Sequence, residues 1–397
     1  MWQTWNLGSK AFMNTTLSPV ASKSGNHSPS NLNNSLPKPW NVVRYENNPI
    51  ITVKNVKPSQ PGWKVEYVMN AGCHRVGDDV LLLLRVAETP LPDADPNIFL
   101  APYYCEKAGK VLFRRLEKND PSYDFRDSRF VLRHDKSGKE ILRVLTSISH
   151  LRVARSKDGV NFTIEEKPAM YPCNKYEEFG IEDPRITFIK EDGYYYINYS
   201  ACASLGVTTN LARTKDWKNF ERLGCIFTPD NKDVCIFPRK INGKYYAMCR
   251  PASAEYRRRE IWISESPDLV SWGNHKLLME VNTNDWDGGR IGCSAVPFET
   301  EDGWVEIYHA ADATHRYCLG VAILDRNDPT KVIAKGKAPL MEPETDYEKY
   351  GFFGNVIFNC GVLCEDGIIK IYYGAADTCM GYAEVSLKEV LDFVLER

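Results

Sequence analysis

The sequence predicts an all-β fold: a five-bladed β-propeller with a short C-terminal helix. Three recurring segments from Trp40 onward predict it: a glycine followed by an aromatic and β-branched run, a short strand ending in an acidic turn, and a polar opening segment. Short strands separated by turn signals at regular spacing are typical of all-β repeat folds. We therefore divide the chain into a tail, residues 1–39, and one propeller domain, residues 40–397.

The first two segments define the strands of each blade. Runs rich in residues of high β propensity follow a glycine at residues 193–200, 243–250, 303–310 and 367–374, with a less regular copy at 78–85. The second segment ends in a turn at Asp158, Asp216 or Asp268, which we expect to be turn formers. These turns lie roughly 50 to 60 residues apart, the length of a four-stranded blade. Five copies of the first segment predict five blades.

The third segment opens each blade and places polar residues at one recurring position. Copies occur at residues 70–72, 182–185, 233–239, 289–292 and 354–358. Because the innermost strand of a blade lines a central channel, these residues should converge on the axis. Apolar residues would pack equally well there, so polar ones predict a binding site.

Two stretches depart from the repeat. An insertion from about Pro90 to Leu151 interrupts the first blades and contains an imperfect echo of the polar segment at residues 123–129. At the C-terminus, helical spacing of apolar residues predicts a helix over Leu387–Leu395.

Composition excludes several classes of protein. A net charge of −2 gives no electrostatic footprint for nucleic acid or an anionic membrane. The twelve cysteines form no pair at zinc-site spacing, so we expect reduced buried thiols, a cytoplasmic location and no metal. Residues 1–39 are rich in Ser, Asn and Pro and contain no Asp or Glu, which predicts a disordered tail without a function of its own.

The central candidate is the pair Glu182-Asp183 followed by Pro184-Arg185. A carboxylate beside an Arg stays ionised, because the opposite charge lowers its pKa. An acid catalyst here requires that the Arg be engaged elsewhere, for example by substrate or phosphate. A structural ion pair in a loop is the alternative.

Other candidates on the axis are cations and sugar-binding side chains. Arg and Lys side chains suit a phosphate, and the cations are Arg85, Lys232, Arg250 and Arg290. Aromatic, amide and acidic side chains suit a pyranose, and these are Asn70, Tyr308, His309, Tyr373 and Asp377. A glycosidase normally needs a second carboxylate, whereas phosphate as the nucleophile does not, so the set predicts phosphorolysis. Each Arg is equally compatible with an interblade salt bridge, and His309 with a packed inner-strand histidine. The run Arg257-Arg258-Arg259 is expected in a solvated loop that would extend the anion surface.

Several of these segments together resemble glycoside hydrolase family 130, the β-mannoside phosphorylases. The resemblance runs from about Val43 to the C-terminus, on residues 180–187, 231–238, 266–273 and 373–377. Residues 80–88, 100–102, 123–125 and 145–147 look most like the enzymes acting on β-1,2-linked mannobiose and mannooligosaccharides. It implies a five-bladed propeller that performs inverting phosphorolysis to α-D-mannose 1-phosphate, with inorganic phosphate as co-substrate and no other cofactor. It also implies a homo-oligomer whose order the sequence does not select.

The resemblance implies roles for individual residues. Asp183 matches the general acid, which protonates the glycosidic oxygen through the mannose 3-hydroxyl. Arg85 and Arg290 match phosphate-binding positions, and Lys232 and Arg250 are assigned to the same pocket. Asp377 matches a sugar-binding carboxylate, and we expect Arg185 and Asp233 to bind substrate as well.

Two alternatives remain open at this point. Some family members are β-mannosidases that have lost the phosphate-binding cations and activate water with glutamates; here Glu255 and Glu306 are the candidates. This chain keeps most of the cations, although Cys249 stands where relatives carry His, Cys293 interrupts a glycine run and Ala310 replaces Gly. The other alternative is a non-catalytic carbohydrate-binding propeller.

Overall fold

The computed structural model describes residues 40–252, 258–282 and 285–397, and these are nearly all β. In this part of the chain the α-helices are α1 (Asp346–Lys349) and α2 (Leu387–Val394). The predicted C-terminal helix is confirmed as α2. Its buried face, Val390, Leu391 and Val394, packs into an apolar cluster that also contains Trp40. No helix among the described residues has the length and apolarity that crossing a membrane requires.

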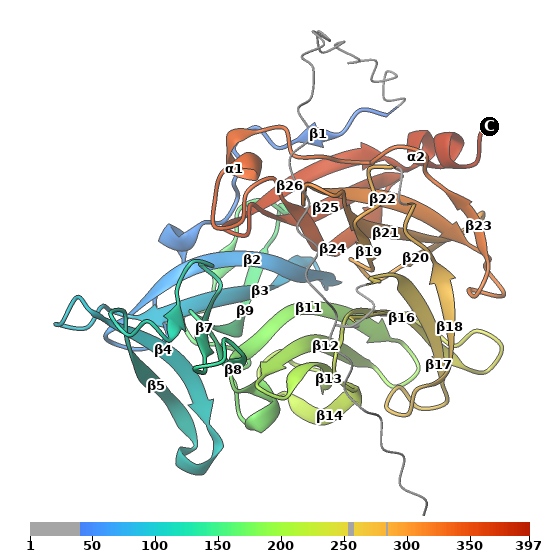
Figure 1. The fold of residues 1–397 in the computed structure, drawn as a ribbon. Coiled ribbons are helices and arrows are strands. Elements are labelled where there is room, and N and C mark those ends of the chain that lie inside the picture. The colour runs from blue at the N-terminus through green and yellow to red at the C-terminus, as the bar shows by residue number, and fades with distance from the viewer. Residues whose placement is uncertain (1–39, 253–257, 283–284) are drawn as a thin grey trace, which may run out of the picture. The chain divides into compact units, whose positions relative to one another are not determined.

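Apart from the insertion, the strands can be grouped into five antiparallel meanders (Figure 1). The first contains β2 (Trp63–Val76), β3 (Asp79–Pro90), β9 (Ile148–Ser156) and β10 (Thr163–Ile164). The second contains β11 (Gly180–Ile189), β12 (Tyr194–Ala203), β13 (Gly206–Thr214) and β14 (Glu221–Phe227). The third contains β15 (Asn231–Ile236), β16 (Tyr245–Pro251), β17 (Ile261–Ser266) and β18 (Gly273–Met279).

The last two meanders complete the set. The fourth contains β19 (Arg290–Gly292), β21 (Gly303–Ala311), β22 (Tyr317–Leu324) and β23 (Val332–Lys335), with β20 (Phe298–Thr300) paired to β21. The fifth contains β24 (Ile357–Glu365), β25 (Ile368–Ala375), β26 (Cys379–Ser386) and β1 (Val43–Arg44). The fifth meander thus joins both ends of the described chain, since Val43 pairs with Glu384. Short parallel pairings of β24 with β2 and of β9 with β11 join the fifth, first and second meanders into one 12-stranded sheet, and the third and fourth are separate sheets.

The predicted glycine-led runs and acidic turns appear in these meanders. The glycine-led runs form the second strands β12, β16, β21 and β25, and Gly243 and Gly367 occupy the left-handed turn before their strands, at φ 79° and 76°. Asp216 accepts hydrogen bonds from the backbone N–H groups of Lys218 and Asn219. Asp158 and Asp268 make the equivalent bonds, so the prediction of turn formers is confirmed.

Apolar clusters lie between successive meanders. Four clusters each lie between two successive meanders: first and second, second and third, third and fourth, and fourth and fifth. A further cluster places Tyr372 and Met380 of the fifth meander against Leu82 and Val86 of the first. Each meander therefore packs against two others, and the series closes on itself.

The insertion forms two small sheets of its own. These consist of β4 (Ile98–Cys105) with β5 (Lys110–Glu117), and of β6 (Tyr123–Asp124), β7 (Phe130–His134) and β8 (Glu140–Leu145). Their core residues pack against Phe179 and Cys202 of the second meander. The Arg114 guanidinium lies 4.2 Å from the Tyr103 ring centroid and pairs with Glu178 at 2.8 Å. The insertion is thereby fixed beside the start of β11.

Candidate active site

A repeated backbone irregularity positions the polar residues that open the first three meanders. Asn70, Asp183 and Asp233 have φ values of 50°, 48° and 56°. Each also lies where the ladder to the next strand shifts register, as in a β-bulge. Asn and Asp tolerate this left-handed conformation better than most residues, and a bulge re-aims the side chain that it carries.

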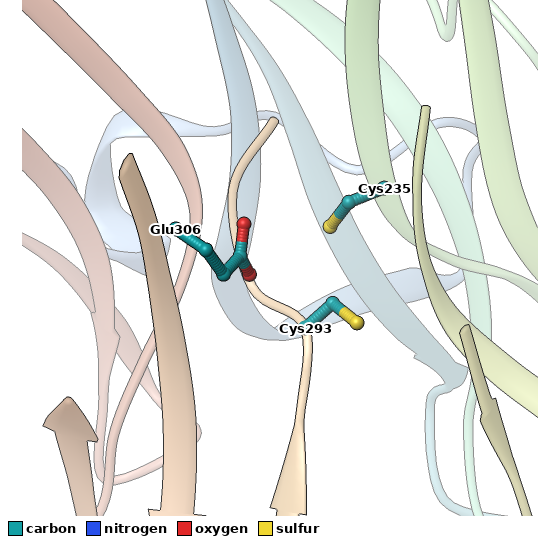
Figure 2. Close-up of side chains that lie close together, drawn as sticks. All are labelled: Cys235, Cys293 and Glu306. Atoms are coloured by element: carbon teal, nitrogen blue, oxygen red, sulfur yellow. The ribbon is translucent and has the colours of Figure 1, made fainter. Parts of the chain in front are cut away.

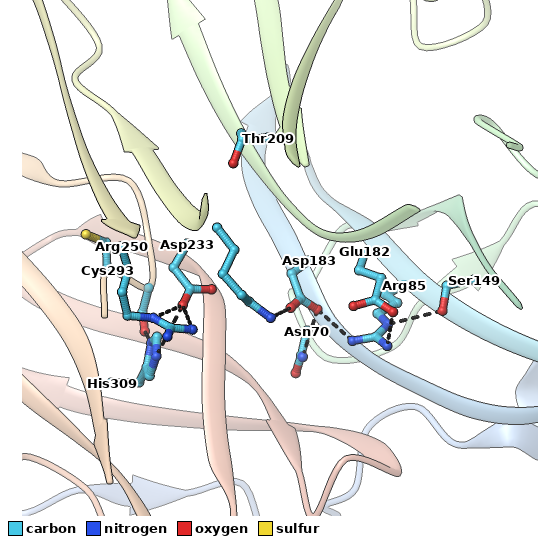
Figure 3. A network of polar contacts seen from close by, with 12 residues as sticks. Asn70, Arg85, Ser149, Glu182, Asp183, Thr209, Asp233, Arg250, Cys293 and His309 are labelled. Atoms are coloured by element: carbon cyan, nitrogen blue, oxygen red, sulfur yellow. Dashed lines mark hydrogen bonds and ion pairs between the residues drawn. The ribbon is translucent and has the colours of Figure 1, made fainter. Parts of the chain in front are cut away.

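Asp183 is at the centre of a buried polar network (Figure 3). Asn70 Nδ2 and Arg85 Nη1 donate to Asp183 Oδ1 over 2.9 Å and 3.0 Å, and Lys232 Nζ lies 3.9 Å from Oδ2. Arg85 also donates to Glu182 at 2.7 Å and to Ser149 Oγ at 3.2 Å. The structure therefore brings together Asn70, Arg85, Asp183 and Lys232, as the sequence predicted.

Two carboxylates at this site have opposite pKa shifts. Burial alone would raise the pKa of Asp183, but the charges of Arg85, Lys232 and Arg185 outweigh it and lower the pKa. Burial raises the pKa of Asp377 to about 6, against the attraction of Arg85 and with added repulsion from Asp183. Asp183 is therefore ionised in the free site, and Asp377 is the more easily protonated of the two.

A second network surrounds Asp233. Arg250 donates to Asp233 Oδ2 through Nε and Nη2, both at 2.7 Å, and His309 Nε2 lies 3.5 Å from the same oxygen. Burial lowers the pKa of His309 to about 3, so its imidazole is neutral. Gly292 leaves room for both side chains, because a Cβ there would lie 2.5 Å from His309 Cε1 and 2.9 Å from Arg250 Nε. Asp233 thus holds Arg250, and His309 lies against the same carboxylate oxygen.

Further cations line a cavity of about 1070 Å³ that also contains Lys232. Arg259 and Arg290 lie in its wall, and strand β8 of the insertion contributes Glu140 and Arg143. Burial lowers the pKa of Arg290, and the positive charges of Arg259, Arg250 and Arg129 add to this effect. Among the described residues no carboxylate pairs with Arg290, whose Nη2 instead lies 3.2 Å from His315 Nδ1. Like charges gathered without a counter-ion are suited to an anion.

Three predicted substrate-binding residues lie elsewhere. Tyr308 is fully buried beside Trp286 in the core between the third and fourth meanders. Tyr373 is fully buried too, and its hydroxyl bonds to Glu348 and Tyr347. Arg185 donates to the carbonyl oxygens of Asp183, Cys293 and Ser294. In this structure each of these side chains is engaged in packing or in hydrogen bonds within the protein and does not line the cavity, so a role in substrate binding stays a prediction for all three.

Of the two glutamates considered as a base for a hydrolase, the structure describes Glu306. Glu306 is 0% exposed and faces Cys235 and Cys293. Glu255 lies outside the described residues.

Sequence reasoning gave no role to two residues of the site, Glu182 and Ser149, which hold Arg85. Arg259, expected in a solvated loop that would extend the anion surface, lines the cavity. Its neighbour Arg258 points elsewhere and pairs with Glu280 at 3.2 Å. Glu182 adjoins Asp183 in the sequence, whereas nothing in the sequence links Ser149 to Arg85.

Comparison with known proteins defines the family. The family model of glycoside hydrolase family 130, described as beta-1,4-mannooligosaccharide phosphorylase, matches residues 127–396. A beta-1,2-mannobiose phosphorylase from Listeria innocua serovar 6a is 46% identical over 351 residues, which cover 88% of this chain and 98% of that protein. A 1,2-beta-oligomannan phosphorylase from Thermoanaerobacter sp. is 42% identical over 260 residues, 65% of this chain and 83% of its own.

A solved structure agrees with these matches. The Listeria innocua beta-1,2-mannobiose phosphorylase in complex with beta-1,2-mannobiose superposes with a TM-score of 0.85 at 45% identity, covering 90% of this chain and 100% of that one. The chain belongs to glycoside hydrolase family 130.

Proposed function

We propose that this protein is an inverting phosphorylase that cleaves β-1,2-linked mannobiose or mannooligosaccharides with inorganic phosphate, releasing α-D-mannose 1-phosphate. The observation that carries the proposal is a group of cations in one cavity. Arg259 and Arg290 have no carboxylate partner among residues 40–252, 258–282 and 285–397, and they line this cavity together with Lys232, which lies 3.9 Å from Asp183. Relatives named beta-1,2-mannobiose phosphorylase and 1,2-beta-oligomannan phosphorylase support the same chemistry.

In the proposed reaction a phosphate oxygen attacks the anomeric carbon while the bond to the glycosidic oxygen breaks. Asp183, which takes up a proton from solvent as phosphate binds, gives it to the mannose 3-hydroxyl while that hydroxyl passes its own proton to the glycosidic oxygen. The proton that hydrogenphosphate carried is released to solvent from the new sugar phosphate, so the cycle consumes no net proton. Phosphate bound beside Lys232 offsets the positive charge that keeps Asp183 ionised, and so raises the pKa of the acid when the nucleophile arrives.

We assign Arg290, Arg259 and Lys232 to phosphate, with Arg250 held behind them by Asp233. Asn70 and Asp377 are assigned to the mannose that is transferred. Asn70 donates a hydrogen bond to Asp183, and the charge of Asp183 helps to raise the pKa of Asp377. Arg85 orients Asp183, because its guanidinium is shared between Asp183 and Glu182.

The finer fold we propose is a five-bladed propeller that comprises residues 40–397 as one catalytic domain. Five meanders whose apolar clusters close from the fifth back to the first support this arrangement. First strands β2, β11 and β24 also contact one another, as expected around an axis. The twelve cysteines form no disulfide in the part of the chain that the structure describes, which supports the cytoplasmic location we propose.

The synthetic direction tests this function. Purified enzyme is incubated with D-mannose and either α- or β-D-mannose 1-phosphate, and release of inorganic phosphate is measured. We expect release with the α anomer alone and a β-1,2-linked disaccharide as the product. Release with the β anomer would contradict inversion, and no release with either anomer would contradict phosphorolysis.

A further inference from the structure

Three buried side chains of metal-ligating type meet between the third and fourth meanders (Figure 2). Cys235 belongs to β15, Cys293 follows β19 and Glu306 belongs to β21. One ligand atom from each, two sulfurs and a carboxylate oxygen, lie within 4.8 Å of one another. All three residues are fully buried.

The carboxylate of Glu306 is incompletely satisfied. Its Oε1 accepts a hydrogen bond from the Ser294 backbone N–H at 3.2 Å, while Oε2 is buried without a partner among the described residues. Leaving a carboxylate oxygen buried and unpaired costs several times the net value of a hydrogen bond. The unpaired oxygen, aimed at two sulfurs, indicates that a cation belongs between them.

The surrounding charge suits a divalent ion. Two thiolates and one carboxylate around an M²⁺ ion carry a net charge of −1. Arg185, fully buried nearby, donates Nη2 to the Cys293 carbonyl oxygen at 3.1 Å and Nε to that of Ser294 at 2.8 Å. Its positive charge, which also faces Asp233 Oδ1 at 3.6 Å, would offset part of the negative charge of the complex and so reduce the penalty for burying it.

We propose that Cys235, Cys293 and Glu306 bind a structural Zn²⁺ ion that links the third and fourth meanders. Sulfur with oxygen donors is a ligand set that Zn²⁺ accepts. Tetrahedral ligands on zinc lie about 3.8 Å apart, so the three side chains need to close by roughly 1 Å. The fourth position is left to water.

The position gives the ion a structural purpose. The third and fourth meanders are separate sheets, with no strand of one in the hydrogen-bonded ladder of the other among the described residues. The ion would also fix residues 293–294, whose carbonyl oxygens hold Arg185, which in turn holds the Asp183 carbonyl at 2.9 Å. Since the site is closed, zinc would enter as the chain folds.

Metal analysis of the whole protein tests the proposal. Protein expressed in zinc-supplemented medium is dialysed against chelating resin, and its metals are measured by inductively coupled plasma mass spectrometry. We expect about one zinc per chain in the wild type and in the control Cys379→Ala, and less than about a tenth of that in Cys293→Ala and Glu306→Gln. Cys379 is a matched control because it is buried but lies on β26, away from the cluster.

Two further measurements, both on the wild-type protein, keep the test decisive if a variant fails to fold. Wild-type protein refolded with Co²⁺ should show a thiolate-to-cobalt charge-transfer band, and zinc-edge anomalous scattering should peak between the three side chains. Wild-type protein without zinc, or zinc retained in both variants, would overturn the proposal. A Glu306→Gln protein that has lost its zinc but is as heat-stable as the wild type would contradict the structural role of the ion.

Discussion

At the scale of single residues, the site separates two carboxylates by their surroundings. Asp183 lies against Arg85, Asn70 and Lys232, which lower its pKa, whereas burial raises the pKa of Asp377 to about 6. An acid held ionised in the free enzyme is poor by itself. It becomes effective when an anionic co-substrate binds to the neighbouring cations, because the added negative charge raises the pKa of Asp183. Proton transfer is thereby coupled to phosphate binding.

Replacing Asp183 by Asn should remove the proton donor and leave the fold intact. The amide keeps the size of the side chain and can still accept from Arg85. We expect kcat for β-1,2-mannobiose to fall roughly 10²- to 10⁴-fold, the usual contribution of a general acid. Circular dichroism should be unchanged, and wild-type turnover in this variant would show that Asp183 is not the general acid.

Arg290 and Arg85 should respond differently to truncation. Arg290→Ala removes a cation that has no carboxylate partner in the described chain, so we expect the phosphate KM to rise roughly 10- to 100-fold with little change in kcat. Arg85→Ala should differ from Arg290→Ala by lowering kcat, because Arg85 orients Asp183. Arg397→Ala, which breaks only the exposed pair with Asp302, is the control. An unchanged phosphate KM in Arg290→Ala would contradict the assigned pocket.

The raised pKa of Asp377 predicts that the stability difference between the wild type and Asp377→Asn depends on pH. Its folded-state pKa is raised from 3.8 to about 6, so the stability it contributes is full below pH 3.8 and is lost as pH rises toward 6. Asp377→Asn mimics the neutral acid. The melting temperature of the variant relative to wild type should therefore climb between pH 4 and 6 and then level off. A difference that is flat across this range would contradict the raised pKa.

At the scale of elements, the joint between β9 and β11 carries the catalytic segment. Gly180 starts β11 at φ 115° and pairs with Ser149, the residue that holds Arg85 Nε. A Cβ at Gly180 would lie 2.5 Å from the Ser149 backbone nitrogen. This close approach, made possible by the missing side chain, sets Asp183 and Arg85 side by side.

Gly180→Ala should therefore weaken both the fold and the activity. We expect a loss of about 2–4 kcal/mol in unfolding free energy, from overpacking plus the left-handed backbone, together with a fall in kcat. Gly193→Ala is the matched control: its φ is 69°, but open space surrounds its Cβ position. It should lose only about 1 kcal/mol and keep its activity. Denaturant unfolding of the two variants makes the comparison, and equal losses would show that contact with Ser149 does not matter.

At the scale of the whole molecule, much of the architecture follows from local sequence. Glycine before aromatic runs, aspartates in turns and the 387–395 helical spacing predicted elements that the structure contains. The burial of Tyr308 and Tyr373 in the apolar clusters between meanders could not be predicted, because alternation along a strand does not say which face meets the next sheet. The group of Cys235, Cys293 and Glu306 was also missed, since ligands 58 and 13 residues apart show no motif spacing.

The most direct test of phosphorolysis is cleavage of β-1,2-mannobiose with and without inorganic phosphate, with products identified by nuclear magnetic resonance. We predict α-D-mannose 1-phosphate and mannose in equal amounts, and no cleavage when phosphate is omitted. Release of free mannose alone, at the same rate in both reactions, would contradict the account and identify a hydrolase.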